Sequence, residues 1–320
     1  MSTSRVRVIA SVPGGIGNFG PGLDVLGCAL TGARDEVIAE WSQTAGITIL
    51  DAGHPQLPND PTKNTASIAA AAVIRAATSR GVRLSHPGIA FTIKKGLPLS
   101  GGQGGSAASA VAGAVAANAL IWPIDSGLQQ NELLACALEG EEAVASRHLD
   151  NIAPSLLGGI VLVRSLNPIE VVKIPAPTGL RIVLATPTQQ LTTMRARSVL
   201  PMEVPRSIVV HQLAQVAAII AACHSNDLAL LGRAMDDRIA EPARLSLLPG
   251  FADAKLSALA AGSLGVSISG AGPTAFALSD SEIAASKIAH AMQSAYQRAG
   301  LVCTVRICEI DTQGAIVKDA

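Results

Sequence analysis

The segment Pro98–Ser106 gives the most specific chemical signal in the sequence. It reads Pro-Leu-Ser-Gly-Gly-Gln-Gly-Gly-Ser, with four glycines in five positions, and an alanine-rich run follows directly. The alternation of Ile89, Phe91 and Ile93 predicts a strand before the loop, and the alanine-rich run predicts a helix to about Leu120. Free backbone N–H groups at a helix start bind anions, and glycine lets phosphate oxygens approach the main chain. The pattern predicts a phosphate-binding loop.

Comparison with known nucleotide-binding and hydrolase motifs limits the kinds of site that this loop could form. No lysine follows the glycines, so the Walker pattern GxxxxGK[ST] is not met, and the hydrolase pattern GxSxG is absent from the sequence. Residues Gly102–Ala107 do fit the loose dinucleotide pattern GxGxx(G/A). The preceding hundred residues do not read as the βαβ unit that this motif needs, so a dehydrogenase is the minor alternative.

A predicted helix over residues 131–147 carries carboxylates that could bind a metal. They are Glu132, Glu139, Glu141 and Glu142. A phosphoryl-transfer site needs a carboxylate facing the phosphates, because Mg²⁺ takes hard oxygen ligands. A run of glutamates on a helix is usually a solvated surface. The residues alone therefore leave the metal ligand open.

The elements that must position these groups are strands and helices in mixed order. Strands are predicted at 5–12, within 36–50 (two strands), and at 89–93, 159–165, 180–186, 266–269, 274–278 and 302–310. Helices are predicted at 64–80, 107–120, 131–147, 206–223, 226–236, 252–262 and 281–299. Besides the phosphate loop, glycine-rich loops are predicted at 13–22 and 269–273. Without a strict βαβ alternation, the pattern favours an α+β protein.

A proline-rich stretch divides the pattern into two halves. Pro168, Pro175 and Pro177 interrupt the periodic segments. A chain of 320 residues is long for one core. We therefore predict an N-terminal domain over 1–167 and a C-terminal domain over 168–320.

Composition excludes several classes of protein. Twenty-four Lys and Arg balance 24 Asp and Glu, without the basic cluster that phosphate backbones need, which argues against a nucleic-acid partner. A content of 49% hydrophobic residues argues against disorder. No run of about 18 uninterrupted apolar residues is present, which argues against a membrane partner.

The cysteines and the N-terminal residues indicate the compartment. The five cysteines are scattered and form no CxxC motif, so we expect buried free thiols. The first residues, Met-Ser-Thr-Ser-Arg-Val-Arg-Val-Ile, show no secretory signal. Both observations predict a cytoplasmic protein.

Six segments resemble, in chain order, the motifs of one known family, the GHMP kinase superfamily of galactokinase, homoserine, mevalonate and phosphomevalonate kinases. Pro98–Ala108 is similar to its phosphate loop and Ser267–Thr274 to its C-terminal glycine motif. The segments that resemble the homoserine kinase branch are Pro13–Gly27, His148–Gly159, Ala196–Pro201 and Ile239–Gly250. The phosphate loop alone points to the superfamily, and the other segments narrow the resemblance to this branch.

The resemblance implies a fold and a reaction. The fold is the GHMP-kinase fold, with a ribosomal-protein-S5-like N-terminal domain and a ferredoxin-like C-terminal domain. The reaction is transfer of the γ-phosphoryl group of ATP to the side-chain hydroxyl of L-homoserine, a step of threonine biosynthesis, with ATP and Mg²⁺ as cofactors. A homodimer is usual for this resemblance.

The resemblance also implies roles for single residues. A substrate carboxylate calls for arginine and an ammonium group for a carboxylate. The implied substrate-binding residues are Asn18, Asp24, His148, Asn151, Arg197 and Arg244. The implied catalytic residues are Asn18, Ser106, Glu141 and Asn151, with Glu141 and Ser106 at the metal and Glu139 or Glu142 as alternatives. The implied nucleotide-binding residues are Asn64, Pro98, Leu99, Ser100, Gly101, Gly102, Gln103, Gly104, Gly105, Ser106, Ala107 and Ala108.

Three positions depart from the family pattern, two in the phosphate loop and one before it. The usual phosphate loop reads Gly-Leu-Gly-Ser-Ser, whereas this chain has Gly-Gln-Gly-Gly-Ser over 102–106. Gly105 removes one hydroxyl of the usual loop. For this reason a relative that binds ligands without catalysis stays an alternative to the kinase. Another kinase of the superfamily, of the mevalonate-pathway type, is the alternative enzyme, but it would lack the paired Arg197 and Arg244. Leu23 replaces a common aromatic residue.

Asp150 raises the question of a general base. Relatives such as mevalonate kinase use an aspartate in this region as the base, whereas homoserine kinase is thought to align the hydroxyl for direct transfer. An alcohol of pKa about 16 gains little from a carboxylate of pKa about 4 before a loose transition state. We therefore expect Asp150 to be mainly structural.

Overall fold

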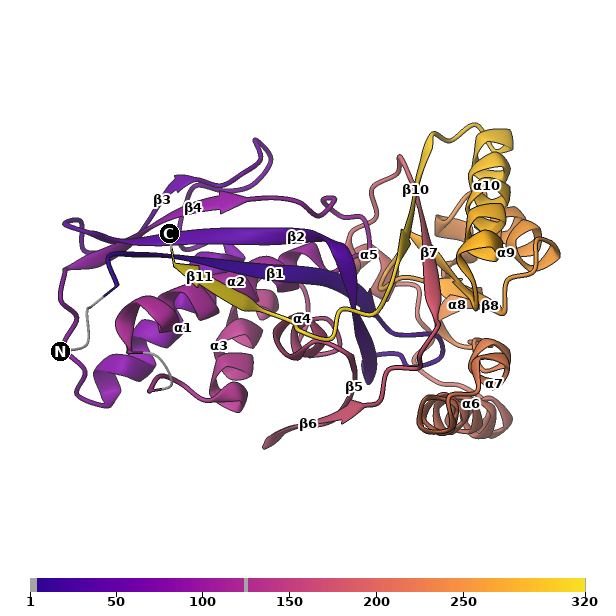
Figure 1. Ribbon diagram of the computed structural model, residues 1–320, viewed down its shortest axis with the longest axis horizontal. Coiled ribbons are helices and arrows are strands. Elements are labelled where there is room, and N and C mark those ends of the chain that lie inside the picture. Colours follow the sequence, from indigo (N-terminus) through magenta and orange to yellow (C-terminus); the bar gives the residue numbers. More distant parts are fainter. Residues whose placement is uncertain (1–4, 124–125, 320) are drawn as a thin grey trace.

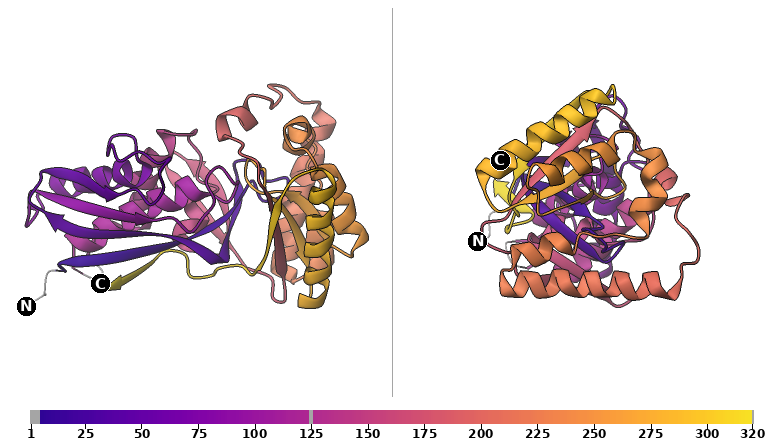
Figure 2. Two further views of the ribbon diagram at one scale, coloured as in Figure 1. Left: turned by 90° about the horizontal axis from the view of Figure 1, so that it is seen from above. Right: turned by 90° about the vertical axis from the view of Figure 1, so that its right-hand side faces the viewer.

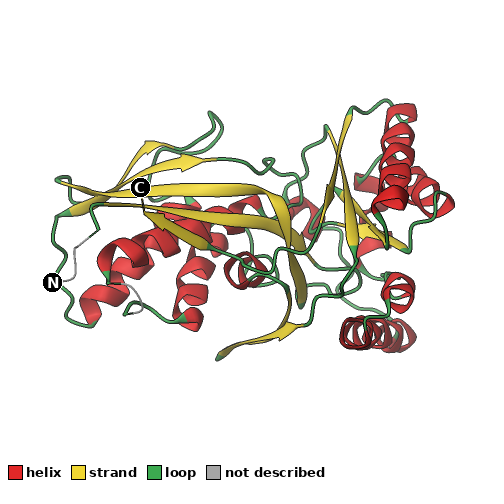
Figure 3. Ribbon diagram, viewed as in Figure 1, coloured by secondary structure: helices red, strands yellow, loops and turns green. Residues whose placement is uncertain are grey.

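The computed structural model describes residues 5–123 and 126–319 and shows two sheets packed against helices (Figures 1 and 3). The first four residues of the segment considered for a secretory signal lie outside this range. The first sheet has the order β11-β1-β2-β4-β3, with β5 paired to β2 and β6 paired to β5. The second has the order β10-β7-β9-β8. This mixed arrangement confirms the prediction of an α+β protein.

The strands of the first sheet come from both ends of the chain. They are β1 (Arg7–Gly17), β2 (Leu26–Ser42), β3 (Gly46–Asp51), β4 (Gly88–Lys94), β5 (Ile160–Leu166), β6 (Ile169–Ile174) and β11 (Ile316–Asp319). Its helices are α1 (Thr65–Ser79), α2 (Gly105–Ile121), α3 (Gln130–Glu142) and α4 (Ile152–Leu157). The four helices lie together on one face of this sheet (Figure 1). Their alanines are buried against valines and isoleucines of the strands, which explains how so few aromatic residues fill this core.

The second sheet is built from the later part of the chain. Its strands are β7 (Arg181–Pro187), β8 (Gly265–Ile268), β9 (Ala275–Ser279) and β10 (Cys303–Cys308). The helices around it are α5 (Thr193–Arg197), α6 (Arg206–Ser225), α7 (Leu228–Arg233), α8 (Ala240–Arg244), α9 (Phe251–Ala260) and α10 (Glu282–Arg298), with a 3₁₀ turn at Leu245–Leu247. Helices α9 and α10 cover the face that is turned away from the first sheet (Figures 1 and 2).

The other face of the second sheet joins the two halves of the protein. Alternate side chains of β7 point to opposite faces, so Val183 packs under α9 and α10 while Leu184 packs toward the first sheet. Leu184 shares a core with Ile16, and the ring of Phe19 stacks on that of Phe276 with centroids 5.4 Å apart. This shared apolar core holds the cavity between the two sheets in a fixed shape.

Most predicted elements are present, and several differ for a physical reason. The predicted loop over 13–22 was wrong in its first part, because β1 continues to Gly17. The strand expected from about residue 36 begins earlier, because β2 starts at Leu26. A Cβ at Gly15 would lie 2.2 Å from the carbonyl oxygen of Cys28, so glycine is what lets these two strands pair. The helix predicted to Arg147 ends at Glu142.

Strands β6 and β11 were not predicted. β6 lies in the proline-rich stretch and β11 at the end of the chain, and both are hydrogen-bonded to the first sheet. The short helices α4, α5 and α8 were missed as well, because five or six residues show no helical periodicity. The division of the chain at residue 168 stays a prediction.

All five cysteines are free and buried, as expected. Burial raises the pKa of the Cys136 and Cys223 thiols to about 11, so neither is a ready nucleophile at neutral pH.

Candidate active site

A cavity of about 370 Å³ lies between the two sheets and gathers most of the predicted site residues. Those that line it are Asn18, Asn64, Pro98, Leu99, Ser100, Gly101, Gly102, Gly104, Gly105, Ser106, Glu141, His148, Asn151, Arg197 and Arg244. Asp24, Gln103, Ala107 and Ala108 are not among its lining residues. Asp150, expected to be structural, also lines it. Residues separated by more than 200 positions thus meet at one site.

The phosphate loop has the geometry expected of an anion site. Helix α2 begins at Gly105, and its N-cap, Gly104, takes the left-handed conformation at φ +68° and contributes no side-chain cap. The first N–H groups of an α-helix have no partner within the helix. Gly105 and Ser106, the first two residues of α2, line the cavity at the positive end of the helix dipole.

Side chains of the C-terminal glycine loop hold the phosphate loop by its carbonyl groups. The hydroxyl of Ser269 donates to the carbonyl oxygen of Gly102 at 2.7 Å, and that of Thr274 donates to Gly101 at 2.5 Å. Gly102, at φ +74°, leaves no room for a Cβ beside the carbonyl oxygen of Gly272, 2.6 Å from where it would lie. The loop over 269–273 therefore packs on the phosphate loop as well as connecting β8 to β9.

A buried ion pair beneath the phosphate loop was not predicted. Lys95 and Asp35 pair with almost no exposed side-chain area, and Nζ of Lys95 also donates to the carbonyl oxygen of Gly105 at 3.0 Å. Asp35 accepts from the backbone N–H groups of Gly96 and Leu97 at 3.0 and 3.1 Å. The position of Lys95, between the predicted strand and the glycine cluster, was the only sequence signal, and nothing local connects it to Asp35.

Glu141 faces the phosphate loop from α3. The hydroxyl of Ser106 donates to Oε1 of Glu141 at 2.9 Å, and Oε2 is buried with no hydrogen-bond partner among the described residues. Burial raises the pKa of the Glu141 carboxyl, and the hydrogen bond from Ser106 offsets this only in part. An orphaned carboxylate oxygen beside a hydroxyl is a donor set that suits Mg²⁺.

The alternative metal ligands lie elsewhere. Glu139 pairs with Arg75 and Glu142 with Arg147, both with side chains about half exposed. Of the three glutamates proposed, Glu141 is the one that lines the cavity.

Arg244 brings a buried positive charge to the opposite side of the cavity. It is only 2% exposed, and it donates from Nε to the carbonyl oxygen of Ala196 and from Nη1 to that of Gly270. Burial lowers the pKa of the guanidinium, and the charge of Asp237 opposes this. Among the described residues no carboxylate lies within ion-pair distance of Arg244. A buried guanidinium without a carboxylate is costly unless a ligand supplies one.

Arg197 and Asp24 pair with each other. Nη1 of Arg197 lies 3.2 Å from Oδ2 of Asp24, and Nη2 contacts the other carboxylate oxygen, in a bidentate arrangement. The two groups implied for the carboxylate and the ammonium of an amino acid thus neutralise each other beside the cavity, which Arg197 lines.

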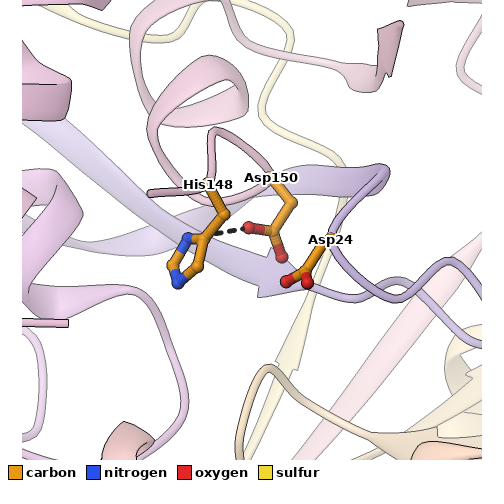
Figure 4. Close-up of side chains that lie close together, drawn as sticks. All are labelled: Asp24, His148 and Asp150. Carbon is orange, nitrogen blue, oxygen red and sulfur yellow. Dashed lines mark ion pairs between the residues drawn. The ribbon is translucent and has the colours of Figure 1, made fainter. Parts of the chain in front are cut away.

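The side chains of His148 and Asp150 lie close to Asp24 of this pair (Figure 4). Nδ1 of His148 lies 3.2 Å from Oδ1 of Asp150, with both side chains buried. Burial lowers the pKa of His148, but the contact with Asp150 and its charge outweigh burial, so the pKa lies above its usual value. One ligand atom from each of the three residues lies within 4.8 Å of the others, which gives a site suited to a cation.

Asn18 is used by the fold itself. It has φ +53°, its Oδ1 accepts from the N–H of Asp24 at 2.8 Å and its Nδ2 donates to Gly270 at 3.0 Å. Its own N–H donates to Oδ2 of Asp150 at 2.8 Å. Asp150 therefore holds a left-handed backbone turn in place, and its role in the reaction stays a prediction.

Asn151 and Asn64 both line the cavity. Oδ1 of Asn151 is buried without a hydrogen-bond partner in the described chain, directly against Gly104 of the phosphate loop. Asn64 is the N-cap of α1, with Oδ1 accepting from the N–H of Ala66 at 3.1 Å. Its contact with adenine stays a prediction.

The fold and this site agree with the GHMP kinases. Residues 64–159 match the GHMP kinases N terminal domain and residues 219–298 match the GHMP kinases C terminal family. The chain belongs to this superfamily, and the predicted GHMP-kinase fold is confirmed.

Comparison with individual proteins shows to which branch of the superfamily the chain belongs. The homoserine kinase of Chlorobaculum tepidum is 41% identical over 310 residues, which cover 94% of each chain. That of Arabidopsis thaliana is 38% identical, covering 97% of this chain and 84% of the plant protein. The crystal structure of homoserine kinase from Cytophaga hutchinsonii superposes with a TM-score of 0.90 at 38% identity over 99% of each chain. The chain belongs to the homoserine kinase family.

The buried carboxylate of Glu141 predicts opposite effects on stability and turnover. Because its pKa is raised in the folded state, the associated stability is complete below the unfolded pKa of about 4.3 and is lost as pH rises through the folded pKa. Glu141→Gln has no carboxyl group to ionise at this position, so its stability does not fall as the pH rises through that range. Without Mg²⁺ at pH 7, the variant should unfold at no lower denaturant concentration than the wild type, whereas kcat should fall on the order of 100-fold.

Glu142→Gln is the matched control, since Glu142 is exposed on the same helix. It should change kcat by less than about 2-fold, as exposed ion pairs contribute little. Equal effects of the two substitutions on kcat would contradict the placement of Glu141 at the metal.

Proposed function

We propose that this protein transfers the γ-phosphoryl group of ATP to the side-chain hydroxyl of L-homoserine, giving O-phospho-L-homoserine for threonine biosynthesis. The observation that carries the proposal is the buried, carboxylate-free guanidinium of Arg244 across the same cavity from the uncapped start of α2. A cavity with an anion site at one end and an unpaired arginine at the other suits a nucleotide beside an amino acid.

The phosphate end would hold ATP through backbone amides. The N–H groups at Gly105, Ser106 and Ala107 stand at the start of α2, and Glu141 with Ser106 would hold Mg²⁺. The metal, when bound, neutralises charge on the phosphate oxygens. A Cβ at Gly105 would lie 3.5 Å from the nearest atom, the carbonyl oxygen of Pro98, so the loop has room for a side chain at this position. Glycine here therefore removes the usual hydroxyl of the family without a change in the shape of the loop, and Ser106 keeps its place.

The amino acid end would exchange partners when substrate binds. In the free protein Asp24 and Arg197 neutralise each other. A zwitterion satisfies both at once, since its ammonium group suits Asp24 and its carboxylate suits Arg197 together with Arg244. A ligand that carries only one of the two charges leaves the other side chain without its partner, which gives the site a basis for selecting amino acids.

The hydroxyl would react without a strong base. Among the described residues, two buried carboxylates line the cavity, Glu141 at the phosphate end and Asp150, and Asp150 already accepts from the N–H of Asn18 and contacts His148. Asn151 would accept the hydroxyl proton in a hydrogen bond and so orient the oxygen, which is supported by its Oδ1, buried beside the phosphate loop with no partner among the described residues. Positioning of this kind supplies most of the rate in phosphoryl transfer.

An ADP-release assay with a panel of hydroxyl compounds tests the proposal. L-homoserine should be the preferred acceptor over L-serine, L-threonine and mevalonate. Mevalonate tests the alternative kinase, because it has a carboxylate but no ammonium group. Turnover with mevalonate, or with none of these compounds, would overturn the proposal.

Arg244→Leu should separate the two substrates. Loss of a buried, charge-assisted contact should raise the KM for homoserine on the order of 100-fold. The KM for ATP should change less than about 3-fold, since Arg244 donates to the carbonyl oxygens of Ala196 and Gly270 and to no group of the loop over 98–106. Steady-state kinetics with each substrate varied in turn measures both, and equal increases would contradict the assignment.

Asp150→Asn distinguishes positioning from base catalysis. An asparagine keeps an oxygen for the N–H of Asn18, so kcat should fall less than about 10-fold, whereas removing a general base costs 10²- to 10⁴-fold. Turnover abolished while both substrates still bind, as measured by calorimetry, would make Asp150 the base.

We also propose that the protein is a homodimer in the cytoplasm, formed through α6. This helix lies along one edge of the molecule (Figure 2, right). It carries an exposed apolar stripe of Val210, Leu213, Ala214 and Ala217. By length and composition α6 is also the one described helix that could cross a membrane. Antiparallel pairing of two copies would bury the stripe and bring Arg206 of each copy to the negative end of the other helix, a favourable charge pairing.

Leu213→Glu tests the dimer, with Leu256→Glu as its control. The two leucines are equally exposed, 65% and 66%, on α6 and α9. A glutamate in the pairing face should weaken the dimer on the order of 100-fold or more, because burying an unpaired charge is costly. Sedimentation velocity should show a dimer for the wild type and Leu256→Glu and a monomer for Leu213→Glu. A monomeric wild type, or one that sediments with lipid vesicles, would contradict this assembly.

A further inference from the structure

Gln103 is the one phosphate-loop residue whose side chain leaves the nucleotide cavity altogether. It is 6% exposed and lines a different cavity of about 740 Å³ on the other side of the loop, together with Thr186 and Arg306 of the second sheet. The family pattern has an apolar residue at this position. The polar side chain therefore has partners here that a leucine could not use.

The carboxamide of Gln103 is bonded at both ends. Its Nε2 donates to Oγ1 of Thr186 on β7 at 2.9 Å, and its Oε1 accepts from Nη2 of Arg306 on β10 at 3.1 Å. Among the described residues, the Arg306 guanidinium has no other hydrogen-bond partner. One side chain of the phosphate loop thus reaches two strands of the second sheet.

The hydrogen bonds return to the loop through two hydroxyl groups. Oγ1 of Thr274 donates its proton to the carbonyl oxygen of Gly101 at 2.5 Å, so in its 2.8 Å contact with Thr186 it must accept. Thr186 therefore donates to Thr274 and accepts from Gln103. The direction of every bond in this chain is fixed, from Nε2 of Gln103 through Thr186 and Thr274 to Gly101, two residues before its start.

These hydrogen bonds, together with one from β1, hold the phosphate loop from two sides. The backbone carbonyl of Gln103 accepts from the N–H of Gly15 on β1 at 3.2 Å, while its side chain bonds to the second sheet. The loop is therefore held by both sheets, and the glycines at 102 and 104, which have positive φ, supply no side chains to hold it themselves.

We propose that Gln103 is a positioning residue for nucleotide binding, which fixes the phosphate loop to the second sheet so that the amides at the start of α2 keep their direction. The inference rests on the proposed function, because it takes the ligand of the loop to be the ATP phosphates. Gln103 touches no nucleotide atom in this account and acts through the loop.

The experiment compares the full-length wild type, Gln103→Leu, the double variant Gln103→Leu/Arg306→Leu, and Gln190→Leu. Gln190 is an exposed amide at the same second cavity and serves as the control. Calorimetry gives the Kd for a non-hydrolysable ATP analogue with Mg²⁺, thermal unfolding gives Tm, and kinetics gives the KM for homoserine.

Gln103→Leu should lower Tm, because it leaves Arg306 unpaired, and should raise the Kd for the ATP analogue about 10-fold, the effect of one lost hydrogen bond. The double variant removes the unpaired charge, so Tm should recover while the Kd stays raised. The KM for homoserine should change less than 2-fold, and Gln190→Leu should behave as the wild type.

Two results would overturn the inference. One is an unchanged Kd in Gln103→Leu, and the other is a Kd that recovers together with Tm in the double variant, which would mean that Gln103 only stabilises the fold. The proposed function fails separately. A wild type that binds the ATP analogue but does not phosphorylate homoserine refutes the reaction and leaves the effect of Gln103 on nucleotide affinity measurable.

Discussion

Backbone amides can hold a phosphate only while no group of the protein uses them, so a phosphate loop must be held by its carbonyls and side chains instead. This constraint organises the structure around α2. Ser269 and Thr274 donate to the loop from the second sheet, and Lys95 donates from the first. Because these donors come from both halves of the chain, the loop depends on how the two sheets are joined. The stacked rings of Phe19 and Phe276 lie in the core that joins them.

The same arrangement explains how a chain of zero net charge serves highly charged ligands. The charged groups proposed to bind the ligands, Arg244 and Glu141, are each buried without an ion-pair partner among the described residues and line the same cavity. Arg244 lies among carbonyl groups, and Glu141 keeps one oxygen without a partner. Each is costly in the free protein, and a ligand of the opposite charge relieves that cost. Long-range attraction contributes little here, so selectivity rests on local partners such as the Asp24–Arg197 pair.

Local signals in the sequence predicted the parts of the site that are local. The glycines before α2, the N-cap at Asn64 and most helices follow from residue type and spacing, and the structure has them. The position of Glu141 came from the resemblance, since residue type alone could not separate it from Glu139 and Glu142. The structure separates them by burial.

Contacts between distant segments could not be predicted in this way. The pair of Lys95 and Asp35 joins residues 60 positions apart, and β11 returns from the end of the chain to pair with β1. Neither leaves a periodic or compositional mark. The bonds of Gln103 are of the same kind, because the sequence showed an unusual residue in the loop but not the strands to which it would bond.

The central claim is that the amides at the start of α2 are free in the unliganded protein and bind the phosphates of ATP. Amide-resolved hydrogen exchange of the wild type, with and without Mg²⁺ and a non-hydrolysable ATP analogue, measures this directly. The account predicts fast exchange at Gly105, Ser106 and Ala107 in the free protein and strong protection when the analogue binds. Amides that are already protected without nucleotide, or that stay unprotected while the analogue is bound, would contradict it.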